Sequence, residues 1–171
     1  MFLLAILIPR EVFSAINLTI SDIAPKEDHY QITAIVTGMS SSSGTFVQGM
    51  FTPADSNKYS GYTFGKKGEW LKYESSPEKS FVLDNYTQLQ NDQPVTIFVK
   101  PDYQDKDYSG PGKYLVKLKR FTASGSPSDY SNAIELDLNY TISTPQPTAT
   151  NTQTPTPTSI TTILTPTKSI T

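Results

Sequence analysis

The chain has 171 residues, with no cysteine and one histidine. This composition excludes disulfides, thiol catalysis and cysteine-ligated zinc, and also a metal centre built from several histidines of this chain. Its 14 Lys and Arg stand against 16 Asp and Glu, for a formal net charge of −2. Because no basic stripe is present, we expect no nucleic-acid partner.

Residues 1–15 form an apolar leader. Its first eight residues read MFLLAILI, which is too short to span a bilayer as a helix but resembles the apolar core of a signal peptide. Small residues at Ser14 and Ala15 offer a cleavage position. No Lys or Arg precedes the apolar run, so a first β-strand or a buried N-terminal segment is the alternative. The signal-like interpretation predicts export to the cell surface.

Residues 16–142 are expected to form one all-β domain. Apolar and polar residues alternate along short segments that turn residues interrupt roughly every 8–12 positions, which is typical of an antiparallel β-sandwich. The expected strands are 18–20, 30–36, 46–51, 59–64, 69–73, 81–83, 95–99, 114–118 and 134–138. No window combines helical periodicity with caps, so no helix is expected.

Two of these strands flank a turn, Gly65-Lys-Lys-Gly68, in which Lys67-Gly68 supplies the positive φ of a tight hairpin. This hairpin is dense in aromatic side chains, whose flat rings can stack on sugar rings. In the alternative interpretation, alternate members fill the core and the others form cross-strand pairs. The candidate binding residues are Tyr59, Tyr62, Trp70 and Tyr73, with Phe64 between them.

An acidic loop follows the strand at 95–99. Its Asp-x-Asp-x-Ser-Gly spacing is similar to the first half of a calcium loop, and hard cations prefer several oxygen ligands. The position for the bidentate Glu is occupied by Val116, inside an expected strand. A solvated acidic turn is therefore the alternative to a Ca²⁺ site. The candidate ligands are Asp102, Asp105, Asp107 and Ser109.

No enzyme signature is present. A Ser-His-Asp arrangement would need His29, but the chain contains no G-x-S-x-G elbow. Carboxylates such as Glu69 and Glu74 have no spacing that predicts a pair across a cleft. We therefore expect no catalysis and no cofactor other than Ca²⁺.

The segment GKYLVKLKRFTASGSPSDYSNAIELDL, residues 112–138, resembles the last hairpin of a fibronectin type III domain. The resemblance implies an Ig-like or fibronectin III-like sandwich in which Tyr114 is the corner tyrosine, with its hydroxyl bonded to backbone upstream. Residues 30–37 lack the tryptophan usual in that family's second strand. The layout, with F-x-x-G-x-F, K-P-D and G-P-G-x-Y motifs, is also similar to uncharacterised surface proteins of candidate-phylum bacteria, which implies a location and no activity.

From Ser143 to Thr171, about two-thirds of the residues are Thr, Ser or Pro. Proline fixes φ and lacks an N–H, and the segment has little apolar surface to offset its ordering entropy. We expect a disordered, extended stalk or linker, with no membrane span in this chain.

Together these features predict a non-catalytic extracellular module of the cell surface that acts as a structural spacer or adhesion domain. The alternative is a glycan- or protein-binding module that uses the aromatic hairpin Tyr59–Tyr73. A binding module should expose a contiguous aromatic patch larger than a few hundred Å², so the glycan alternative fails if its aromatic residues are mostly buried. These residues are Tyr59, Tyr62, Phe64, Trp70 and Tyr73.

Overall fold

The computed structural model of the protein describes residues 15–40 and 43–139. The expected leader, apart from Ala15, and the Thr/Pro-rich segment 143–171 lie outside the described residues, as do the last residues of the expected domain, 140–142.

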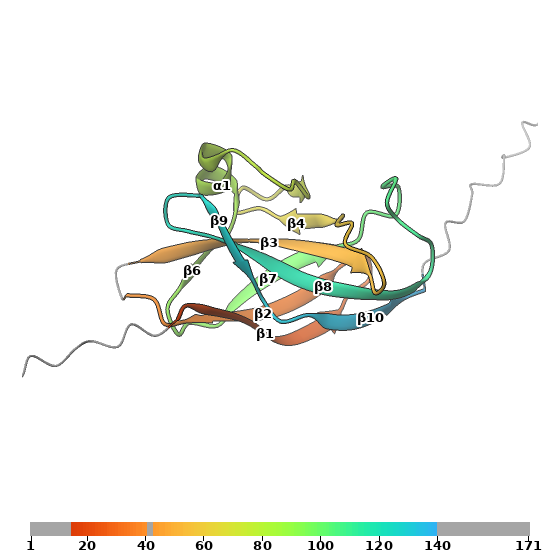
Figure 1. Ribbon diagram of the computed structural model, residues 1–171, viewed down its shortest axis with the longest axis horizontal. Helices are drawn as coiled ribbons and strands as arrows, with labels where there is room; N and C mark the ends of the chain where they lie inside the picture. The colour runs from red at the N-terminus through yellow and green to blue at the C-terminus, as the bar shows by residue number, and fades with distance from the viewer. Residues whose placement is uncertain (1–14, 41–42, 140–171) are drawn as a thin grey trace, which may run out of the picture.

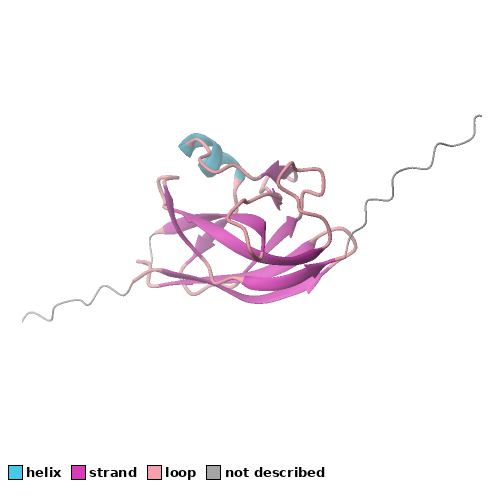
Figure 2. Ribbon diagram, turned by 45° about the vertical axis from the view of Figure 1, so that its right-hand side comes forward, coloured by secondary structure: helices cyan, strands magenta, loops and turns pink. Residues whose placement is uncertain are grey.

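The described chain folds into two antiparallel sheets with one short helix, which confirms the all-β prediction (Figure 1). The first sheet has the order β1-β2-β7-β4-β5, with bounds Asn17–Pro25, Tyr30–Thr37, Val95–Lys100, Tyr62–Phe64 and Trp70–Lys72. The second sheet has the order β10-β8-β3-β6, with bounds Ile134–Leu138, Gly112–Phe121, Gly44–Pro53 and Gln88–Gln90. A further strand, β9 (Pro127–Tyr130), pairs with β8, and the helix α1 spans Lys79–Asn85. The two sheets and the position of α1 above them are seen in Figure 2.

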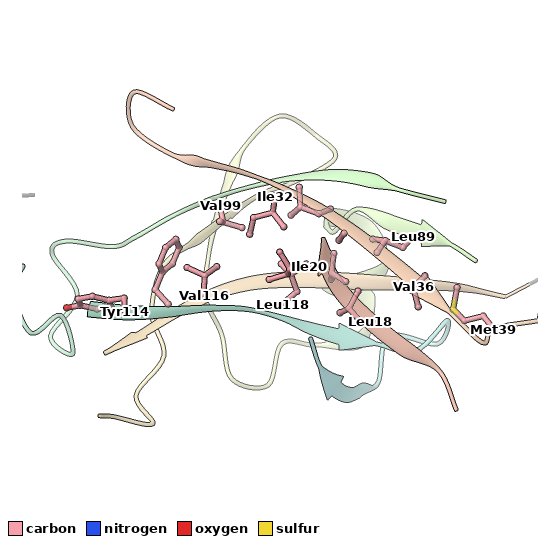
Figure 3. Close-up of a cluster of buried hydrophobic side chains, with 14 of the residues drawn as sticks. Leu18, Ile20, Ile32, Val36, Met39, Leu89, Val99, Tyr114, Val116 and Leu118 are labelled. Atoms are coloured by element: carbon pink, nitrogen blue, oxygen red, sulfur yellow. The ribbon is translucent and has the colours of Figure 1, made fainter. Parts of the chain in front are cut away.

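The main core lies between the two sheets and follows from the period-two pattern. Alternate residues of β2 and β7, such as Ile32 and Val99, point toward Val116 and Leu118 of β8 (Figure 3). All four of these side chains are fully buried. At one end of this core the Tyr114 hydroxyl donates to the Gly110 carbonyl at 3.0 Å, which confirms the expected bond to upstream backbone.

Strand β3 departs from alternation, because all ten of its residues are buried. Strand β6 pairs only with Gly44–Phe46 of β3, and the rest of that side is covered by the chain around β4. There Phe51 and Ser60 exchange two backbone hydrogen bonds of 2.8 and 2.9 Å. The Thr63 hydroxyl accepts a further bond from the Gly49 N–H at 2.7 Å. These contacts join the two sheets at one edge and place β4 and β5 as an extension of the first sheet.

The expected strand at 81–83 is wrong, because these residues lie in α1. The helix has only seven residues, and its N-cap, Glu78, makes no side-chain capping bond. Isolated helices this short are unstable in water, so tertiary packing must hold it. That packing is a second buried cluster, which we call the satellite core and which consists of Phe46, Leu71, Val82, Tyr86 and Phe121. Within the described residues, no helix is long and apolar enough to cross a membrane.

Candidate functional site

The hairpin formed by β4 and β5 turns as the sequence predicts. The Gly65 N–H donates to the Glu69 carbonyl at 2.8 Å, and Gly68 has a φ of +88°. Thr63 and Leu71 point into the protein and are buried, so their strand neighbours point outward. The outward aromatic residues are Tyr62, Phe64 and Trp70, and all three are half-buried.

Four rings on this outer face form a closed cycle around an open hollow. His29, Phe98, Phe64 and Trp70 follow one another around it, with centroid distances of 5.5, 6.2, 5.2 and, back to His29, 5.8 Å. Each ring is inclined to the next, by 80°, 83°, 65° and 56° in the same order, which is a usual packing geometry for aromatic side chains. The hollow has a volume of about 230 Å³ and is lined by these four residues. We call it the aromatic box.

The box is built from neighbouring strands of one sheet. Phe98 alternates with the buried Ile97 and Val99 of β7 and therefore faces outward. Phe64 and Trp70 are cross-strand partners on β4 and β5. His29 directly precedes β2, where its Nδ1 lies 2.7 Å from Asp28 Oδ1. This hydrogen bond lowers the pKa of the Asp28 carboxyl and fixes the orientation of the imidazole.

A polar groove adjoins the box. It has a volume of about 310 Å³, and His29 lines both hollows. The Lys100 ammonium, which lines the groove, lies 4.4 Å from the centroid of the Trp70 ring and 5.6 Å from that of Tyr62. The complete lining of the groove is Lys26, Glu27, Asp28, His29, Tyr30, Lys100, Pro101 and Tyr103.

The other two aromatic candidates lie elsewhere. Tyr59 and Tyr73 lie just outside β4 and β5, and they pack with Tyr130 of β9. Their ring centroids are 6.0 Å apart for Tyr59 and Tyr73 and 6.5 Å apart for Tyr59 and Tyr130, and Tyr130 is 48% exposed. We call these three residues the tyrosine trio. Of the four candidate binding residues, Trp70 alone lines the aromatic box. Tyr62 lies on the same face beside Lys100, and Tyr59 and Tyr73 belong to the tyrosine trio.

The acidic loop is organised around lysine side chains. The Lys72 ammonium lies 2.9 Å from Asp102 Oδ2 and 3.1 Å from Asp105 Oδ2. Burial acts to raise the pKa of Asp102, but the Lys72 contact and the Gln104 N–H outweigh it, and the pKa of this carboxyl is lowered. The hydrogen bonds of Lys72 to Asp102 and Asp105 raise the pKa of the Lys72 ammonium.

The remaining calcium candidates are also engaged within the protein. Asp107 pairs with Lys58 at 3.2 Å and with Lys106 at 2.6 Å. The Ser109 N–H donates to the Tyr114 hydroxyl at 3.0 Å. Residues 15–40 and 43–139 contain no group of three or more His, Asp or Glu side chains placed to hold a metal ion. The arrangement favours a lysine-bridged turn over a Ca²⁺ site, because ammonium groups already neutralise the acids.

Sequence reasoning did not identify His29, Phe98 and Lys100 as members of a site. Phe98 and Lys100 could have been found from the alternation in TIFVK, which puts them on the face opposite Ile97 and Val99. His29 carries no such signal, because it lies just before its strand and meets Trp70 only through the fold.

No protein family model matches the chain. No curated protein and no solved structure matches it significantly. The geometry of the aromatic box and its groove is therefore the basis on which function is inferred.

Proposed function

We propose that this domain is a non-catalytic adhesion module of an extracellular cell-surface protein, and that the aromatic box is its binding surface. The observation that carries the proposal is the cycle of four rings around a hollow on the outer face of the first sheet. The solvent face of an antiparallel sheet is ordinarily polar, so four half-buried rings around a hollow there are a departure that a binding role would explain.

The lining of the site supports a binding role over a catalytic one. Asp28 and His29 are hydrogen-bonded, but neither the box nor the groove is lined by a serine, threonine or cysteine among the described residues. Acyl transfer through a histidine requires such a nucleophile beside it. The apolar leader and the Thr/Pro-rich segment from Ser143 support the cell-surface location, on composition alone.

The strand order supports membership of the Ig-like and fibronectin III-like sandwiches. In a constant-type Ig domain the first, second, fifth and fourth strands form one sheet, and the third, sixth and seventh form the other. The orders β1-β2-β7-β4 and β3-β8-β10 follow the same scheme. Strands β5, β6 and β9 and the helix α1 are additions to it. The corner position of Tyr114 at the start of β8 agrees with this proposal.

A spacer role is the second candidate, and one observation favours it. The described chain enters at the start of β1 and leaves after β10 at opposite ends of the sandwich (Figures 1 and 2). A domain of this kind can be placed in series between other segments of a chain. The spacer role needs no ligand and is compatible with a binding surface on one flank.

An array of glycans and surface proteins probed with the full chain tests the adhesion proposal. We expect at least one partner whose binding falls about tenfold or more in Trp70→Ala, because a central aromatic anchor carries much of the energy of an interface. Tyr130→Ala, a change in the tyrosine trio, is the control and should retain that binding. Partners that bind Trp70→Ala as well as the original chain would show that the aromatic box is not the binding surface.

A further inference from the structure

The aromatic box is a shallow hollow that can hold one small group. Its four rings contact one another in a closed cycle and border a hollow that is open to solvent on the outer face. The hollow of about 230 Å³ is smaller than the roughly 300–1,000 Å³ of pockets for drug-sized ligands. It therefore takes a single head group.

The chemistry of the lining discriminates between head groups. The polar atoms of the four lining side chains are the imidazole nitrogens of His29 and the indole N–H of Trp70, and Nδ1 of His29 already bonds Asp28. A sugar ring would leave most of its hydroxyls without partners here, and each lost bond weakens binding. A trimethylammonium group has no N–H or O–H to satisfy, and the faces of aromatic rings attract its charge.

Lys100 shows that these rings accept a cation. Its ammonium lies 4.4 Å from the centroid of the Trp70 ring, within the roughly 6 Å at which a cation–π interaction operates. Lys100 lines the adjoining groove and not the box, so the box is open to a second cation. An ammonium group bound in the box and the Lys100 ammonium would repel each other. The ligand therefore binds better if it also carries an anionic group that lies beside Lys100.

The groove can receive that anion. Lys26 and Lys100 both line it, and His29 belongs to both hollows, so one ligand can extend from the box into the groove. Glu27 and Asp28 line the groove as well, and Asp28 is turned to His29 by their 2.7 Å hydrogen bond. The two lysines and the two acids of the lining balance each other formally, so the attraction for an anion is local to Lys100, whose ammonium lies over the Trp70 ring.

We propose that the aromatic box binds a quaternary ammonium group of a ligand whose phosphate lies in the groove beside Lys100, as in phosphocholine. This inference rests on the proposed function, because it assumes that the box is a binding site. It specifies the ligand class of that site.

Trp70 is the only tryptophan of the chain, so its fluorescence reports directly on the box. The full chain is titrated with phosphocholine, with choline and with 3,3-dimethylbutanol, the uncharged carbon isostere of choline. We expect choline to bind about fivefold or more tightly than the alcohol because of its charge, and phosphocholine to bind more tightly than choline. An alcohol that binds as tightly as choline would overturn the proposal.

Two variants separate the ring contacts from the phosphate contact. Phe98→Leu keeps the box apolar but removes one ring face, and should weaken choline and phosphocholine about fivefold while leaving the alcohol unaffected. Lys100→Met should reduce phosphocholine to the affinity of choline, while choline itself binds no more weakly because a like charge has been removed. Tyr130→Leu, in the tyrosine trio, is the matched control and should change none of the three affinities.

Phosphocholine could come from a lipid or from a soluble or sugar-linked source. Co-sedimentation with phosphatidylcholine vesicles in addition to binding of soluble phosphocholine would identify the lipid head group, and soluble binding alone would identify the other source. The absence of saturable binding of choline and phosphocholine up to about 50 mM, well beyond millimolar affinity, would overturn the inference. If a partner on the array still depended on Trp70 in that case, the proposed adhesion function would stand and only its ligand class would fail.

Discussion

The aromatic box and the satellite core are both rich in aromatic side chains, but the box lies at the surface and the satellite core is buried. In the satellite core the rings of Tyr86 and Phe121 stack nearly parallel, at 19° and a centroid distance of 5.8 Å, and both residues are fully buried. In the box, neighbouring rings are steeply inclined and surround a hollow. The angle between rings does not make this difference, because Phe81, which packs against the satellite core, meets Tyr86 at 86°. The difference is burial, since the rings of the box are half-buried beside a hollow on the surface.

One short strand supplies both regions. In β5, Trp70 points outward into the box and Leu71 points inward to the satellite core. Side chains of a strand alternate between its two faces. A residue next to Trp70 in the strand therefore packs inside the protein, although Trp70 itself lines the box. The position of a ring in the alternation, more than its chemical type, therefore decides what it does here.

The largest effect is expected from removing a ring of the satellite core. Phe121→Ala should lower the free energy of unfolding by about 3–5 kcal/mol, because it deletes a fully buried ring and leaves a cavity. Urea denaturation measures the loss. Phe98→Ala, in the half-buried box, is the matched change and should cost less than half as much. Equal losses would mean that the box is part of the core rather than a surface.

A second prediction concerns the hydrogen bonds that Gln48 makes beside the satellite core. The buried Gln48 amide bonds the Glu74 backbone in both directions, at 2.8 and 3.1 Å, and accepts from the Tyr86 hydroxyl at 2.7 Å. Gln48→Leu leaves these partners unsatisfied and should cost about 2–3 kcal/mol of unfolding free energy.

Tyr86→Phe removes only one of these hydrogen bonds and should cost about 1 kcal/mol. Since the two residues share a bond, the loss in the double variant should be smaller than the sum of the two single losses. Strictly additive losses would show that the two side chains do not interact.

A smaller effect is expected in the acidic loop, where it depends on pH. The pKa of Asp102 is lowered in the folded state, so its contact with Lys72 stabilises the protein above the pKa of an unfolded aspartate, about 4. This contribution is lost as the pH falls through the lower, folded pKa. Because Lys72 is 54% exposed at its side chain, we expect it to be less than about 1 kcal/mol.

The variant Lys72→Met tests this contribution by urea denaturation at several pH values. It should be less stable than the original chain near neutral pH, and the difference should vanish in acid once Asp102 is protonated. A difference that stays constant with pH would assign the effect to packing of the lysine stem.

Much of the sandwich was predictable, because its strands are amphipathic. The alternation in β8 and β10 identified both strands, and the bond from the Tyr114 hydroxyl to upstream backbone was implied by the resemblance to a fibronectin type III hairpin. The helix α1 was not predictable, because seven residues without a capping bond carry too weak a helical signal and its stability comes from contacts with distant residues. The strands β6 and β9, with three and four residues, are too short to show a period.

Only part of the candidate site was predicted from the sequence. The hairpin was identified as aromatic, but its rings were treated as one group, because the ends of the strands and the positive φ of Gly61 that separate Tyr59 and Tyr73 from Tyr62 and Trp70 are set by the fold. The contribution of His29 was beyond sequence reasoning, because 41 positions separate it from Trp70 and only the strand order brings them together. The same holds for the lysine that joins Asp102 and Asp105, which comes from β5.

The most direct test of the aromatic box is the NMR signal of the single indole N–H in the uniformly ¹⁵N-labelled full chain. The account predicts that this resonance moves saturably on addition of phosphocholine, and that 3,3-dimethylbutanol at the same concentration moves it far less. A resonance that stays in place with phosphocholine, while the protein remains folded, would contradict the claim that the four rings bind a quaternary ammonium group.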